Sequence, residues 1–151
     1  MSETPDSAVN RMAIAVLSMA GLFVALYLLA HSLGWTGPLI CGIGECATVQ
    51  SSKWAKLGPI PVSAFGVVGY LSLLGASLWG LQPAGAASRA TSAILLALAA
   101  FALAYSAFLT YLEAFVIRAW CQWCVISAIL VTLIFLAALP ELKRLRGRSG
   151  A

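Results

Sequence analysis

Charged side chains are scarce in this sequence: they make up 9% of its 151 residues, against 62% hydrophobic residues. Soluble domains carry about 25% charged residues, and packing in water cannot hide so much apolar surface in a short chain. The mean hydropathy of +0.96 therefore excludes a soluble globule and favours a protein of the lipid bilayer. The net charge of +4 is modest and clusters at the C-terminus, which suits lipid headgroups as partners and argues against nucleic acid.

Four stretches lack charge over about the twenty residues that a membrane-spanning helix needs. We expect them to span the membrane over residues 12–31, 61–81, 90–111 and 120–139. The fold class is then all-α, an integral membrane bundle of four transmembrane helices in a single domain, residues 1–151. Residues 1–10, expected to be disordered, and 141–151 form its tails, with Pro140 ending the last span. A cleaved signal peptide is the alternative for the first stretch, although its apolar part is longer than in such peptides.

The positive charges predict how the spans are oriented. Four spans place both termini on one side together with Arg11, Arg89 and the four cations of the C-terminal tail, against three cations on the other side. By the positive-inside rule, the side with more cations is cytoplasmic. We therefore expect a multi-pass protein of the cell membrane (the inner or plasma membrane) with both termini in the cytoplasm. The long loop over residues 32–60 then lies outside the cytoplasm and holds a short surface helix.

Small residues recur along one side of the third span. They are Ala93, Ala97, Ala100, Ala104 and Ala107. Small side chains let helix backbones approach closely in lipid, so we expect this stripe to face another helix.

Cysteines number only four, and they form two close pairs. Cys41-Gly-Ile-Gly-Glu-Cys46 lies in a loop that we expect to be flexible, and Cys121-Gln-Trp-Cys124 opens the fourth span. A Cys-x-x-Cys is a dithiol/disulfide couple or half of a metal site. Since thiol pairs also bind soft metals such as Hg, Cu and Zn, a soft-metal binding or transport protein stays an alternative to a redox enzyme.

The position of the second pair predicts a reactive thiol. The positive end of a helix stabilises a thiolate, and Arg118, three residues before Cys121, is expected to add a full charge. A loop pair on the wet side and a helix pair at the membrane edge would form a two-step electron relay. The sequence holds no haem, flavin or dinucleotide motif, so a membrane quinone is the expected acceptor.

The order of these pieces resembles the vitamin K epoxide reductase family, in its bacterial stand-alone form, over about residues 12–139. The matching pieces are the loop from Cys41 through Cys46 to Trp54, the entry to the second span from Pro61 to Gly66, and the Cys121-Gln-Trp-Cys124 motif. The resemblance implies a four-helix bundle around a quinone, which is ubiquinone, menaquinone or a vitamin K-type quinone. It also implies a quinone-dependent, disulfide-forming oxidoreductase, a functional analogue of disulfide-bond formation protein B.

The resemblance assigns roles to all four cysteines. In the family the second thiol of the helix pair faces the quinone, here Cys124. The first, here Cys121, exchanges with the second loop cysteine, Cys46, while Cys41 meets the soluble partner. We expect that partner to be a separate, extracytoplasmic thioredoxin-like protein, and the chain itself to be a monomer without a resident metal.

The resemblance also points to the residues around the quinone. Besides Cys124, these are Ser52, Phe65 and Trp123. Animal members have a tyrosine where this chain has Ala128 and an asparagine where it has Val62. Both would hydrogen-bond vitamin K oxygens, so their absence favours plain quinone reduction over epoxide reduction.

Overall fold

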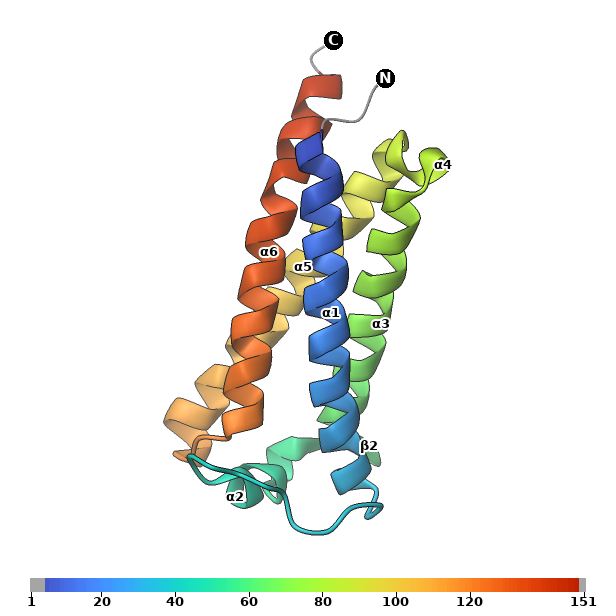
Figure 1. Ribbon diagram of the computed structural model, residues 1–151. Helices are drawn as coiled ribbons and strands as arrows, with labels where there is room; N and C mark the ends of the chain where they lie inside the picture. The colour runs from blue at the N-terminus through green and yellow to red at the C-terminus, as the bar shows by residue number, and fades with distance from the viewer. Residues whose placement is uncertain (1–4, 150–151) are drawn as a thin grey trace.

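Four long helices dominate the computed structural model, which describes the backbone of residues 5–149 and the side chains of residues 8–147 (Figure 1). They are α1 (Pro5–Ser32), α3 (Val62–Leu81), α5 (Arg89–Tyr111) and α6 (Gln122–Ser149). Each is long and apolar enough to cross a membrane. The expected all-α bundle of four spanning helices is therefore confirmed, and the chain is a multi-pass membrane protein.

The helices pack as an antiparallel bundle in which α1 lies against α3 and α6, and α5 lies against the same two helices. Figure 1 shows both chain ends and α4 (Pro83–Ala86) at one end of the bundle, here called the terminal end. The opposite end holds residues 32–61 and 112–121 and is called the thiol end. Ile14, Tyr70, Leu95 and Ile134, one from each long helix, are buried in the shared core, so α1 packs as an integral part of the bundle.

Two helices are longer than the sequence predicted. Helix α1 begins at Pro5, so residues 5–10 are helical and not disordered, while residues 1–4 lie outside the described part. Helix α6 continues through Pro140 to Ser149, and the prediction that Pro140 ends it was wrong. Helix α6 continues past Pro140 because the residue that follows, Glu141, is buried inside the bundle.

A buried ion pair joins the helices at the terminal end. The Arg11 guanidinium lies 2.8 Å from one oxygen of Glu141, and both side chains are almost completely buried. Arg11 also donates to the carbonyl of Gly80 at 2.7 Å and to the hydroxyl of Ser92 at 3.3 Å. The Arg11 side chain of α1 thus contacts α3, α5 and α6. These contacts explain why α1 and α6 stay helical beyond their apolar segments.

The connection between α1 and α3 contains several short elements at the thiol end. The expected surface helix is present but short, as α2 (Cys46–Gln50) followed by a single 3-10 turn, η1 (Lys53–Ala55). Strands β1 (Lys56–Leu57) and β2 (Ile60–Pro61) then form a small antiparallel hairpin. This hairpin leads directly into α3.

A π-helix, η2 (Leu112–Ile117), extends α5 where the sequence suggested a connecting loop. It ends at Arg118, whose backbone is left-handed, with φ +57°. Such wide turns often mark functional sites, and this one positions Glu113.

The alanine stripe of α5 faces outward, contrary to expectation. All five alanines are exposed. The buried face of α5 is formed by Thr91, Ser92, Leu95 and Ala99, because the polar contacts of Arg11 and Glu141 fix the rotation of the helix at its first turn.

Candidate functional site

The two cysteine pairs meet at the thiol end. Cys41 and Cys46 form a disulfide with a Cα–Cα distance of 6.1 Å, whereas Cys121 and Cys124 are free thiols. Cys46 and Cys121 are fully buried in one small cluster, against which Cys41 and Cys124 also pack. The structure therefore brings together all four cysteines that the sequence singled out.

The disulfide loop is docked and not free to swing. Gly44 pairs with Cys121 as an antiparallel β-bridge, and the N–H of Glu45 donates to the carbonyl of Trp120 at 2.6 Å. The Gln122 side-chain oxygen accepts from two further N–H groups of the loop, at 2.9 Å each. Flexibility was inferred from the glycines, but Gly44, with φ +96°, serves instead to let the loop approach: a Cβ there would lie 2.4 Å from the Trp120 carbonyl oxygen.

Cys121 occupies the N-cap position of α6, since its carbonyl accepts the first helical hydrogen bond, from Val125 at 3.0 Å. A hydrogen bond from the Cys124 thiol lowers the pKa of Cys121 to about 7, although burial opposes this. The backbone N–H groups of Cys124 and Trp123 and the Gln50 side chain also stabilise the Cys121 thiolate and lower its pKa. The expected activation by the helix N-terminus thus acts through specific donors.

Arg118 does not contribute as predicted. Its side chain is exposed, and among the side chains that the structure describes, residues 8–147, it has no ion pair or hydrogen bond. The left-handed backbone at Arg118 turns the chain, so Arg118 is not on a helix that continues to Cys121. The groups next to the thiols are Gln50 and Glu113, which the sequence analysis did not single out. The lone acid of an otherwise apolar helix was the available signal for Glu113.

A cavity of about 510 Å³ lies beside the thiol pair and is partly open to the surface of the bundle. All four long helices and residues 49–55 line it, and most of its surface is apolar. Cys124 lines this cavity whereas Cys121 does not, so the two thiols face different neighbours. Its volume falls in the usual range for small-molecule sites, about 300–1,000 Å³.

Two hydroxyl groups in the cavity wall have no partner. Among the described residues, Ser63 Oγ and Tyr105 Oη are buried without a hydrogen bond, and both side chains line the cavity. Buried polar groups are normally paired, so a ligand with two hydrogen-bond acceptors in an apolar frame would satisfy this site. Neither residue was expected from the sequence, because a serine or tyrosine in an apolar helix carries no distinctive pattern.

The residues expected around a quinone divide into two groups. Ser52, Phe65 and Cys124 line the cavity. Trp123 is not among its lining residues; its indole N–H donates to the carbonyl of Ile40 at 2.8 Å and its ring packs edge-on against Tyr27. Trp123 therefore contacts the loop and α1.

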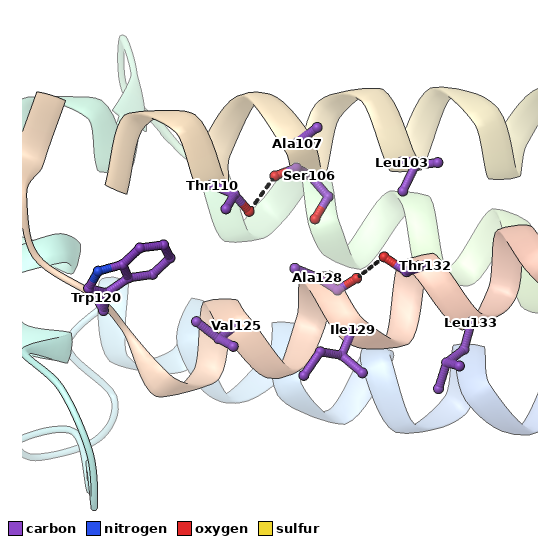
Figure 2. Close-up of a pocket in the computed structure, with 10 residues that line it drawn as sticks. All are labelled: Leu103, Ser106, Ala107, Thr110, Trp120, Val125, Ala128, Ile129, Thr132 and Leu133. Carbon is purple, nitrogen blue, oxygen red and sulfur yellow. Dashed lines mark hydrogen bonds between the residues drawn. The ribbon is translucent and has the colours of Figure 1, made fainter. Parts of the chain in front are cut away.

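A second hollow lies on the outer face of the bundle, between α5 and α6 (Figure 2). Trp120, Ile129 and Leu133 are exposed along it. Ser106 and Thr110 line both this groove and the cavity beside the thiol pair, so the two hollows adjoin along α5. In Figure 2 the Thr110 hydroxyl is bonded to the Ser106 carbonyl within α5, at 2.9 Å.

The soft-metal alternative gains no support from side-chain geometry. Within the part of the chain that the structure describes, no three His, Cys, Asp or Glu side chains gather as metal ligands would.

The fold and the site together define a multi-pass membrane protein with a dithiol/disulfide centre at one end. The model of the Vitamin K epoxide reductase family matches residues 12–139, which is most of the chain, and the chain belongs to this family. It is accordingly a membrane thiol oxidoreductase.

Proposed function

We propose that the chain is a thiol–quinone oxidoreductase that generates disulfides in a thioredoxin-like protein and passes the electrons to a membrane quinone. One observation carries the proposal: Cys121 packs against the loop disulfide, while Cys124, three residues on, lines the cavity with the unpartnered hydroxyls. A dithiol that faces a disulfide on one side and a ligand-sized cavity on the other can pass electrons between them.

The relay proceeds by thiol–disulfide exchange. A partner thiolate attacks Cys41 Sγ and breaks the Cys41–Cys46 bond, and the second partner thiol completes the partner's own disulfide. The freed Cys46 then attacks Cys121 of a Cys121–Cys124 disulfide, and Cys41 restores the loop disulfide by displacing Cys121. The result is a loop disulfide beside two free thiols, which is the arrangement in the structure.

The cavity residues fit a quinone. The hydroxyls of Ser63 and Tyr105 would donate to its two oxygens, with Ser52 and Phe65 in the surrounding wall. When Cys121 and Cys124 close their disulfide they release two electrons and two protons, which a quinone held in this cavity would take up. The proposal leaves ubiquinone, menaquinone and vitamin K-type quinones as candidates, because two carbonyl oxygens on a flat ring are common to all three.

The direction of electron flow implies an orientation. A thioredoxin-like partner that needs oxidation works in an oxidising compartment, so the thiol end faces out of the cytoplasm and both termini face in. This agrees with the excess of cations at the terminal end under the positive-inside rule. The membrane is then the inner or plasma membrane.

Quinone reduction by purified protein tests the proposal. With a reduced thioredoxin-like donor, the wild type should reduce quinone, and Cys124→Ser should abolish this while its loop disulfide still exchanges with the donor. Cys41→Ser should lose activity with the protein donor but keep it when a small permeant dithiol replaces that donor. Loss of both half-reactions in both variants would contradict the relay, and absence of quinone reduction by the wild type would contradict the proposed function.

A further inference from the structure

Glu113 is the single carboxylic acid among the residues that line the cavity. Its side chain, on the π-helix η2, is only 4% exposed. A buried ionisable group at membrane depth is expensive and is usually retained for function. The relay described above makes no use of it.

Both reactive cysteines contact this carboxyl group. Glu113 Oε2 accepts the backbone N–H of Cys121 at 3.1 Å, and Glu113 and Cys124 both line the cavity, where the carboxyl group interacts with the Cys124 thiol. Among the described side chains, residues 8–147, no Lys, Arg or His forms an ion pair with Glu113. An unpaired acid that touches a reacting thiol and borders the cavity has the connections that a proton carrier needs.

We infer that Glu113 accepts the proton of the Cys124 thiol as the Cys121–Cys124 disulfide closes and delivers it to the ligand in the cavity. This inference rests on the proposed function, in which that ligand is a quinone. The Cys124 S–H bond breaks, the S–S bond forms, and two electrons leave the thiol pair for the quinone. One proton travels through Glu113 and the second comes from Cys121 or solvent, so the quinone gains two electrons and two protons.

Few other titratable groups face Glu113. From α6 these are Cys121 and Cys124, and the cavity wall adds the phenols of Tyr70 and Tyr105. Tyr70 is already bonded to the Ser127 hydroxyl at 2.7 Å. Arg118, on the adjoining turn, is exposed. Glu113 is thus the carboxyl group at this position, beside the thiol pair and the cavity.

A purely positioning role can be separated from proton transfer by a conservative change. In Glu113→Gln the amide oxygen can still accept the Cys121 N–H, but the side chain cannot carry a proton. Single-turnover quinone reduction should fall by about 100-fold in Glu113→Gln and recover in part in Glu113→Asp. Exchange between the loop disulfide and a small dithiol should be unchanged in Glu113→Gln, and single-turnover quinone reduction should be unchanged in the control Glu45→Gln, whose acid is exposed. Wild-type rates in Glu113→Gln would overturn the inference.

Infrared difference spectra of the quinone-free protein give a readout that does not depend on quinone reduction. When an added small-molecule disulfide oxidises Cys121 and Cys124, the Cys124 proton passes to Glu113, so a protonated carboxyl band should appear on oxidation and vanish on reduction by a small dithiol. The band should be absent from Glu113→Gln and present in Glu45→Gln. A spectrum without such a redox-linked band would overturn the proton-carrying role even in an active enzyme. If the band is present but the wild type fails to reduce quinone, the proposed function fails and the proton link stands.

Discussion

Gln50 shows how a residue outside the cysteine motif can control thiol chemistry. Its amide nitrogen lies 3.5 Å from Cys124 Sγ and 3.9 Å from Cys121 Sγ, so one side chain of α2 reaches both thiols. Donors to sulfur favour the thiolate. The lowered pKa of Cys121, about 7, is therefore a property of the docked loop as well as of α6.

This leads to a prediction about pH. The Cys121 thiolate should form as pH rises through about 7 and be lost below it, when followed by ultraviolet thiolate absorbance of the reduced protein. Gln50→Leu removes one donor and should move the midpoint upward by less than about one unit. Cys124→Ala should move it further, because the Cys124 thiol makes the largest favourable contribution.

Ser51→Ala is the matched control, since Ser51 is the exposed neighbour of Gln50 and bonds only within its own turn. An equal midpoint in Gln50→Leu and Ser51→Ala would exclude Gln50 as a donor to the thiolate.

At the residue scale the sequence was sufficient to identify the reactive cysteines but not the side chains that contact them. Spacing alone reveals Cys121 and Cys124, since two thiols three residues apart on a helix must be neighbours. Gln50 and Glu113 are 71 and 8 residues from Cys121. They become neighbours only through the docked loop and the π-helix, neither of which has a local sequence signature.

Among the elements, the disulfide loop departs most from what its sequence suggested. Two glycines usually indicate freedom, yet Gly44 takes a left-handed φ so that the backbone can lie against Trp120 and Cys121. Glycine is permissive in this region and other residues are strained there. The same property that favours flexibility in an isolated loop here allows close backbone pairing.

Gly44→Ala should therefore undock the loop. The added Cβ meets the Trp120 carbonyl oxygen at 2.4 Å, and the left-handed backbone adds strain, together about 1 to 3 kcal/mol. We expect slower exchange between Cys46 and Cys121, measured by trapping the mixed disulfide, and faster hydrogen exchange at Glu45. Gly37→Ala, where a Cβ meets nothing within 4 Å, should leave both unchanged; the same behaviour in the two variants would refute the docking role of Gly44.

For the whole molecule, length and apolar pattern were enough to predict four spans, but they could not reveal where the helices are tied together. Arg11 and Glu141 are 130 residues apart and lie in segments that the sequence assigned to the cytoplasmic boundary and tail. Their pairing is set by the antiparallel order of the bundle. Arg11 of α1 thus connects to one residue each of α3, α5 and α6 at the terminal end. The reactive groups lie at the opposite, thiol end.

Removing one member of this pair should destabilise the whole bundle. Arg11→Leu or Glu141→Leu leaves an uncompensated buried charge and should lower the free energy of unfolding by about 3 to 5 kcal/mol, measured by thermal unfolding in detergent. The double variant Arg11→Leu/Glu141→Leu should recover much of this. Arg144→Leu, which removes a half-exposed cation 3.7 Å from Glu141, should change it by less than about 1 kcal/mol, and equal losses in Arg144→Leu and Arg11→Leu would contradict the assignment.

The position of Ser106 and Thr110 in both linings has a further consequence for kinetics. The same two residues border the cavity and the groove that opens sideways between α5 and α6 (Figure 2), so under the proposed function a quinone would approach the cavity from the bilayer. A quinone that takes this way is delivered by diffusion in two dimensions. Under the proposed function, the quantity that sets saturation is then the mole fraction of quinone in the lipid, and a Michaelis constant stated per litre of buffer has no fixed meaning for this enzyme.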